Sequence, residues 1–257
     1  MNLLRNEFVK LLKLKKLYIF LLILLVNEAL VIYFYKFPGS MKSIIVSPNG
    51  QSVPLTLVNG MAQFMTIFIP IYLADSITGE YRSGTLKLSL LQPVDRLDLL
   101  RAKLAALFIF ITLIVSFSVL SSYIMGTVAF GWGSYTGYAG TRYAPAQGIV
   151  LTLTAYALLL LPYLAYGMMA AFVAVSATNG STTIVLCITA VTAGQYLNSF
   201  AALKPFSLVN QMYFYHEYFL KGLNWPAAIL STAVIFGYVA VFYLLAAHRF
   251  SKKDIVY

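Results

Sequence analysis

Six long runs of apolar residues constrain the fold of this chain more than any other feature of its sequence. Each run has about 20 residues or more, which is the length that a helix needs to cross a hydrocarbon core of about 30 Å. The runs are continuous and do not alternate with polar residues, so they predict helices and not the strands of a membrane barrel. The predicted spans are residues 17–35, 55–74, 104–130, 149–175, 182–200 and 226–247.

The composition also indicates a membrane protein. Of the 257 residues, 60% are hydrophobic and only 10% are charged, whereas about 25% of the residues of soluble domains are charged. The sequence shows no repeat of fixed period and no second soluble domain. We therefore expect an all-α membrane protein in which residues 1–257 form a single transmembrane domain.

The positions of the lysines and arginines predict the orientation of the spans, because cytoplasmic loops are enriched in basic residues. Most of these residues lie before the first span, in the loop over residues 75–103 and at the C-terminus. We therefore expect both termini and this loop to face the cytoplasm, most simply of a bacterial plasma membrane. The net charge of +10 follows from these boundary positions, so it does not predict a nucleic-acid partner.

The first sixteen residues predict a helix that lies in the membrane interface. Leu4, Phe8, Leu11 and Leu12 recur at helical spacing on one face. The basic residues lie mostly elsewhere, where they would meet anionic headgroups. Alternatively, these basic residues serve only as a signal for orientation.

Two loops on the opposite side are rich in aromatic residues. Residues 131–148 are rich in glycine and tyrosine and predict an extended cap over the helices. The aromatic residues within 208–220 predict a short helix at the outer interface.

The sequence lacks the motifs that would make this chain an enzyme. It contains no G-x-x-x-x-G-K-[ST] loop to hold a nucleotide phosphate. His216 and His248 fall in different compartments by the predicted topology, and Cys187, the single cysteine, falls inside the fifth span as a buried thiol. We therefore predict no catalytic residue, no metal site and no cofactor in this chain.

Polar residues inside the spans are candidates for a translocation path. Glu28 falls near the middle of the first span, where a charge costs about 2.5–3.5 kcal/mol and so requires a partner, a proton or water. It is either a contact for a substrate or cation, or a protonated glutamate that stabilises helix packing. The other polar residues either line a path or bridge helices by hydrogen bonds. The path candidates are Glu28, Asn27, Gln63, Gln195 and Asn198.

The segment GEYRSGTLKLSLLQPVDRLDLLRAK, residues 79–103, is a polar and charged run between two apolar spans. Asp95 is suited to cap the start of a helix, and Asp98 in its first turn is favoured by the helix dipole. That helix would continue through Lys103 into the third span. A rigid helix continuous with a span would act as a lever, because a force on the loop would tilt the span.

This segment resembles the cytoplasmic loop of type-2 ABC transporter permeases, which are the membrane subunits of bacterial ABC exporters. Their loop carries an acidic residue, a Gly-Thr pair, two leucines, a proline, an arginine and a lysine in this order. The matching residues are Glu80, Gly84, Thr85, Leu90, Leu91, Pro93, Arg96 and Lys103. The resemblance extends to the six spans, to an amphipathic elbow helix within residues 1–16, and to LKPF at residues 203–206.

The resemblance implies that residues 76–91 form a coupling helix that docks on a separate ATP-binding subunit. The implied partners are two copies of that subunit, which would hold ATP and magnesium, a second permease chain, identical or paralogous, and membrane lipid. Glu80 is expected to contact the ATP-binding subunit or the elbow helix, whereas Arg96 and Lys103 are alternatively ordinary cations at the membrane boundary. The expected coupling residues are Glu80, Tyr81, Arg82, Gly84, Thr85, Leu86, Pro93 and Arg96.

The function implied by this resemblance is ATP-driven export of an amphipathic or hydrophobic compound, such as a peptide antibiotic, a drug or a lipid-like molecule. Small permeases of bacteriocin-immunity and bacitracin-resistance systems are similar in size and architecture. A first alternative is an ATP-independent secondary transporter or channel that uses Glu28 as its proton or cation site. A second alternative is a structural or sensory membrane partner that moves nothing itself.

Overall fold

The chain contains six helices that are long and apolar enough to cross a membrane, and they coincide with the six predicted spans. A computed structural model describes residues 3–37, 47–83, 95–222 and 224–252. The long helices are α2 (Lys15–Lys36), α3 (Val53–Leu73), α6 (Arg96–Phe130), α7 (Pro145–Ser176), α8 (Gly180–Leu197) and α11 (Trp225–Lys252). The prediction of an all-α membrane architecture is confirmed at this level.

Shorter elements connect or precede the long helices. Helix α1 (Leu3–Lys13) forms where the sequence predicts an amphipathic helix. A π turn η1 (Ala74–Gly79) and a short helix α4 (Glu80–Arg82) continue α3 beyond its last α-helical residue. On the other side lie β1 (Thr136–Tyr138), β2 (Thr141–Tyr143), η2 (Lys204–Phe206), α9 (Leu208–Phe214) and α10 (Glu217–Leu220).

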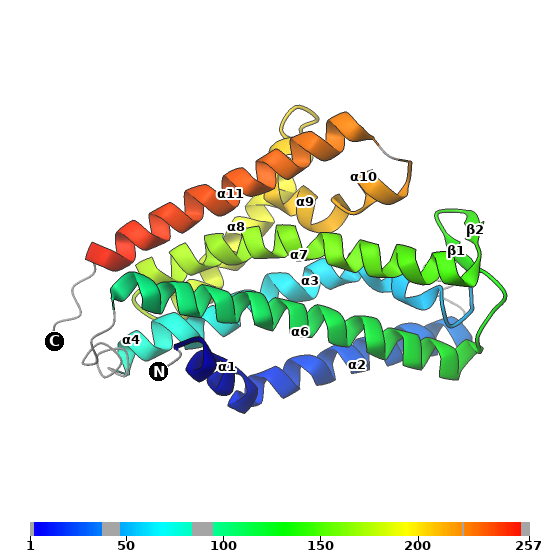
Figure 1. Cartoon of the computed structure of the whole chain (residues 1–257), viewed down its shortest axis with the longest axis horizontal. Coiled ribbons are helices and arrows are strands. Elements are labelled where there is room, and N and C mark those ends of the chain that lie inside the picture. Colours follow the sequence, from blue (N-terminus) through cyan, green and yellow to red (C-terminus); the bar gives the residue numbers. More distant parts are fainter. Residues whose placement is uncertain (1–2, 38–46, 84–94, 223, 253–257) are drawn as a thin grey trace.

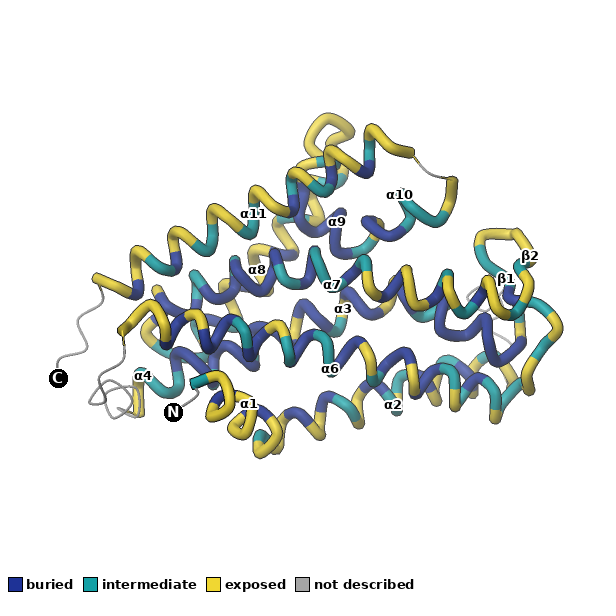
Figure 2. Tube along the Cα trace, in the orientation of Figure 1, coloured by how far each residue is buried: buried dark blue, intermediate teal, exposed yellow. Residues whose placement is uncertain are grey.

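The long helices run side by side along the longest axis of the molecule (Figure 1). The N-terminus, the C-terminus, α1 and α4 lie at one end, which we call the termini end, and the β1–β2 hairpin lies at the opposite end. Helices α3, α6 and α7 pack against one another and form the interior. More than half of the residues in their most apolar windows are buried, against 17% for α8 and α11, whose exposed flanks are the yellow stretches in Figure 2.

Local sequence explains several of the helix boundaries. Pro54 and Pro145 lie in the first turns of α3 and α7, where a missing amide hydrogen costs nothing. Asn179 caps α8, because its Oδ1 accepts a hydrogen bond of 2.8 Å from the amide of Thr182. Asp95 precedes α6 as predicted, but its side chain makes no capping hydrogen bond, so the predicted side-chain cap is wrong. Its backbone carbonyl instead accepts from the amides of residues 98 and 99.

Two predicted short helices differ from the structure. Residues 76–82 are not the start of a separate helix but the end of the helix that begins at Val53, and the rest of the predicted coupling helix, residues 84–91, lies outside the described residues. Helix α9 does not lie at the surface, since it packs against α3, α7, α8 and α11 and most of its residues are buried. The aromatic content of the segment was misleading because Leu208, Val209 and Met212 provide an apolar face for the core.

Candidate functional site

Four charged residues at the termini end form an ion-pair cluster around the buried Lys103, which we call the four-charge cluster: Glu7, Lys10, Glu80 and Lys103. The side chain of Lys103 is 0% exposed. Its Nζ donates hydrogen bonds of 2.7 Å to the carbonyl oxygen of Ser76, 2.8 Å to Glu80 Oε2 and 3.3 Å to Glu7 Oε2. The ammonium group therefore has three acceptors for its three hydrogens, which is what a buried lysine requires.

Lys10 completes this cluster from the side of α1. Its Nζ lies 2.8 Å from Glu7 Oε1 and 2.8 Å from Glu80 Oε1. Partial burial acts to lower the pKa of Lys10, but hydrogen bonds and electrostatic attraction from Glu7 and Glu80 outweigh it and raise the pKa above its ordinary value. Each carboxylate thus bridges two lysines, and the cluster joins α1, α4 and the first turns of α6.

Further contacts fix the end of the second long helix on the rest of the bundle. Lys16 Nζ lies 2.8 Å from Asp75 Oδ2 and forms a second, more exposed tie to the N-terminal segment. Thr78 Oγ1 donates a 3.0 Å hydrogen bond to the carbonyl oxygen of Ala174 and lies 3.1 Å from Thr183 Oγ1. The described residues just before position 84 are therefore held by α1, α6, α7 and α8 together.

The predicted coupling residues occupy different environments within the described residues. Glu80 belongs to the four-charge cluster, and Tyr81 packs half-buried against the core. Arg82 is exposed. The Arg96 guanidinium donates a 3.2 Å hydrogen bond to the carbonyl oxygen of Ser251 near the end of α11. Gly84, Thr85, Leu86 and Pro93 lie outside the described residues.

The predicted path candidates differ in burial and in hydrogen bonding. Glu28 is buried, and its Oε1 accepts a 2.9 Å hydrogen bond from Ser121 on α6, while its Oε2 has no hydrogen-bond partner among the described residues. Asn27 and Asn198 are half-buried, whereas Gln63 and Gln195 are exposed. In the part of the chain that the structure describes, no side-chain hydrogen bond joins any two of these five residues.

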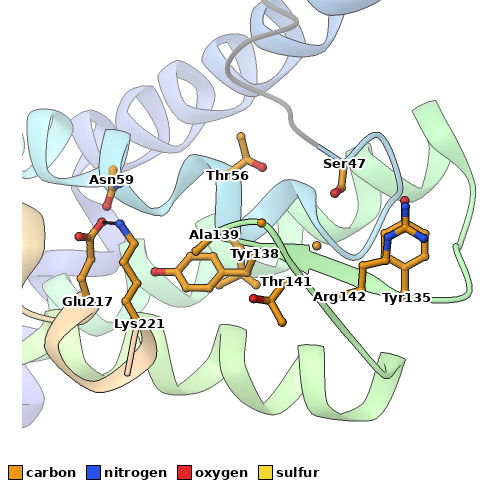
Figure 3. Close-up of a pocket in the computed structure, with 13 residues that line it drawn as sticks. Ser47, Thr56, Asn59, Tyr135, Tyr138, Ala139, Thr141, Arg142, Glu217 and Lys221 are labelled. Carbon is orange, nitrogen blue, oxygen red and sulfur yellow. Dashed lines mark ion pairs between the residues drawn. The ribbon is translucent and has the colours of Figure 1, made fainter. Parts of the chain in front are cut away.

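A polar pocket of about 390 Å³ lies at the end opposite the termini (Figure 3). Segments that are far apart in the sequence converge on it: the start of α3 with the residues just before it, the β1–β2 hairpin, and α10 with the residue that follows it. At one side the Glu217 and Lys221 side chains form an ion pair of 2.8 Å, and at the other Arg142 lies 4.7 Å from the ring centre of Tyr135. The pocket therefore presents hydroxyl, amide and opposed charged groups.

The hairpin turn shapes this pocket. Ala139 and Gly140 have φ angles of 48° and 82°, a left-handed pair that a two-residue hairpin requires and that alanine adopts at some cost. Tyr138 projects from the turn, and its hydroxyl has no hydrogen-bond partner within the described segments. Burial and the charge of Glu217 raise the pKa of Tyr138 to about 12. Sequence reasoning identified this region only as a glycine- and tyrosine-rich cap.

The contact of Glu80 with Lys10 on α1 agrees with one of its two expected partners, the N-terminal helix, whereas sequence reasoning missed the pairing of Glu80 with Lys103 and the contact of Lys103 with Glu7. One ion pair of the four-charge cluster could have been predicted, because Glu7 and Lys10 lie one turn apart on a predicted amphipathic helix. No group of three or more potential metal ligands occurs among the described residues.

Comparisons with known proteins add a family assignment. The family model described as "Protein of unknown function (DUF2705)" matches residues 17–256, which is nearly the whole chain. The comparison with curated proteins found no match. The chain therefore belongs to the DUF2705 family.

Proposed function

We propose that this chain is the membrane-spanning permease subunit of an ATP-driven ABC exporter. The observation that carries the proposal is the four-charge cluster, in which the acidic and lysine ends of the permease-like segment, Glu80 and Lys103, lie 2.8 Å apart. The segment between them would receive the movement of a separate ATP-binding subunit. No sequence motif for nucleotide binding is present in this chain, so energy would have to come from such a partner.

The contacts of the cluster support a mechanical role. A displacement of the chain between Glu80 and Arg96 would reach α3 through Glu80 and would reach α6 through its first residue, Arg96. Because Lys103 binds the Ser76 carbonyl and Glu80, the second and third spans would move as a pair and not independently. Packed elements of this kind rearrange between discrete states and do not deform gradually, which suits a step driven by ATP.

The remaining parts of the proposal follow the permease resemblance. Two ATP-binding subunits would hold ATP and magnesium, and a second permease chain, identical or paralogous, would complete the translocation path. The cargo would be an amphipathic or hydrophobic compound such as a peptide antibiotic, a drug or a lipid-like molecule. The termini end, which carries most of the basic residues, would face the cytoplasm of a bacterial plasma membrane.

A substitution at Glu80 tests the coupling role. Glu80→Gln keeps the shape of the side chain but removes the charge that binds Lys10 and Lys103. We expect the variant to insert into the membrane and to bind the ATP-binding subunit, while ATP hydrolysis no longer drives export. Asp75→Asn is the matched control, since it removes a carboxylate from the same helix end that pairs only with the exposed Lys16. Normal export by Glu80→Gln would exclude the coupling role.

One observation favours a second candidate function. Glu28 is a buried carboxyl group inside a span with one hydroxyl donor and one oxygen without a partner among the described residues. Such a group is a reasonable proton or cation site for an ATP-independent transporter or channel. This alternative predicts ion flux from the purified chain alone in liposomes and its loss in Glu28→Gln, whereas the exporter predicts no flux without the ATP-binding subunit.

A further inference from the structure

An apolar groove runs between α1 and α6 at the termini end. It has a volume of about 700 Å³ and is largely open to the outside. Leu4 and Phe8 remain 42% and 38% exposed there, so the protein itself leaves this apolar surface uncovered. The lining residues are Leu3, Leu4, Arg5, Phe8, Ala102 and Ile109.

Arg5 is the single charged residue among those that line this groove. Two other cations of the N-terminal segment are already neutralised: Lys10 binds Glu7 and Glu80, and Lys16 binds Asp75. Arg5, in contrast, is exposed and makes no ion pair or hydrogen bond with any residue in the described ranges. The groove thus combines a long apolar wall with one unneutralised guanidinium group.

We propose that this groove binds an anionic phospholipid. An acyl chain would lie along Leu4, Phe8 and Ile109, where each buried methylene group contributes about 0.8 kcal/mol. The headgroup phosphate would accept hydrogen bonds from the Arg5 guanidinium, whose planar donors match phosphate oxygens. A zwitterionic lipid would fit the same wall, but its ammonium group would offset the attraction between Arg5 and the phosphate.

A bound lipid would influence the four-charge cluster, because the same short helix carries both sites. Arg5 and Phe8 lie within one turn of Glu7, Phe8 also lies within one turn of Lys10, and Ala102 precedes the buried Lys103. By filling the space between α1 and α6, the lipid would hold α1 in the position from which Glu7 and Lys10 reach Lys103 and Glu80. The anionic lipid content of the membrane would therefore set how firmly α1 is docked. This inference does not depend on the proposed function.

Lipid competition on the purified full-length chain tests this site. The chain is equilibrated with equimolar phosphatidylglycerol and phosphatidylcholine of matched acyl chains, and retained lipid is counted by native mass spectrometry. We expect the wild-type chain to retain more phosphatidylglycerol, and Arg5→Gln to lower the ratio of the two lipids about fivefold, as expected for one basic residue near the membrane surface. Ile109→Trp, which narrows the groove, should lower retention of both lipids.

Lys13→Gln is the matched control, since Lys13 is an exposed cation of the same helix that does not line the groove. The proposal holds if Lys13→Gln keeps the wild-type ratio while Arg5→Gln loses it. An equal loss in both variants would show a general effect of basic surface charge and would overturn the site, as would a wild-type chain with no preference. Thermal unfolding of each variant in detergent, without added lipid, confirms that Arg5→Gln is folded.

Discussion

The side chain of Lys103 is fully buried among its ion-pair partners. Its stability there depends on Glu7, Glu80 and the Ser76 carbonyl, which lie between 2.7 and 3.3 Å from Nζ. A buried ion pair contributes less to net stability than its contacts suggest, because removing the lysine and the carboxylates from water costs free energy that offsets their attraction. The ion pairs of Lys103 do, however, make it costly in free energy to separate α4 from α6, because the separation would leave buried charges unpaired.

This penalty can be measured. We expect Lys103→Met to lower the free energy of unfolding by about 3–5 kcal/mol, because two partly buried carboxylates would be left with Lys10 alone. Arg101→Met is the control: this neighbouring cation is exposed and pairs with Asp98 at 3.0 Å, so its loss should lower the free energy of unfolding far less than the loss of Lys103. Chemical unfolding in detergent micelles measures the free energy of unfolding of each variant. Similar decreases in Lys103→Met and Arg101→Met would contradict the burial of the Lys103 ion pairs.

His216 predicts a dependence of stability on pH. It is fully buried, and neither ring nitrogen has a hydrogen-bond partner within the described part of the chain. Burial lowers the pKa of His216 to about 4, while the charge of Glu217 opposes this shift and that of Lys221 adds to it. The folded chain thus keeps His216 neutral between pH 6.5 and 4, where the unfolded chain binds a proton, so its contribution to stability is present above about pH 6.5 and is lost as the pH falls.

The test compares the wild-type chain with His216→Phe from pH 7 to pH 5. We expect the wild-type chain to lose about 1–2 kcal/mol more of its unfolding free energy than the variant over this range, since each unit between the two pKa values corresponds to about 1.4 kcal/mol. Parallel pH profiles for the two chains would mean that His216 is protonated or hydrated in the fold.

For single residues, the sequence predicted which polar side chains lie in the spans better than it predicted whether they are buried and what they contact. Glu28 was expected near the middle of a span in need of a partner, and it is buried against Ser121. Gln63 and Gln195 also lie in spans but are exposed, because sequence does not show which side of a helix faces the bundle when the helix is apolar all round. Lys103 could not be distinguished from a boundary cation, since its partners lie on two other elements.

At the scale of elements, close contact between α6 and the start of α3 depends on a small residue. A Cβ atom added at Gly126 would lie 2.8 Å from the carbonyl oxygen of Gly50 and 2.9 Å from Val53 Cβ. Backbone atoms cannot move aside as a flexible side chain can. The helices would have to separate, which would open the interior that α3 and α6 share.

We therefore expect Gly126→Ala to lower the free energy of unfolding by about 1–3 kcal/mol, which is typical of overpacking. Gly60→Ala in α3 is the control, since nothing lies within 4 Å of its added Cβ atom. It should leave stability unchanged or raise it by up to about 1 kcal/mol, because alanine has the higher helix propensity. The test is to measure the free energy of unfolding of both variants in the same detergent. An unchanged value for Gly126→Ala would contradict the close packing of α6 against the start of α3.

The long helices and α1 were predictable, whereas the positions of the other short helices were not. Continuous hydrophobicity over about 20 residues identifies a span whatever its neighbours are. Short helices take their position from tertiary contacts: α9 is drawn into the bundle by Leu208 and Met212, and residues 76–82 continue α3 because Thr78 binds α7 and α8. The sequence pattern of a few residues does not predict these tertiary contacts.

At the scale of the whole molecule, the proposed orientation gives a prediction. Lys252 at the end of α11 and Arg142 in β2 are both exposed and lie at opposite ends. The native Cys187 is buried and should not react. In intact cells, a membrane-impermeant maleimide should label Arg142→Cys but not Lys252→Cys, and permeabilisation should expose both. Labelling of Lys252→Cys in intact cells would reverse the proposed orientation.

The proposed function requires that a separate ATP-binding subunit drive this membrane chain. The most direct measurement is gentle affinity purification of the chain from its native membrane, followed by an assay of the eluate for vanadate-sensitive ATP hydrolysis. We expect a stoichiometric ATP-binding subunit to co-purify and to hydrolyse ATP, and the cargo would then be the next question. A chain that is recovered alone and inactive, even after crosslinking in the membrane, would contradict the exporter and leave Glu28 as the residue to test by ion flux.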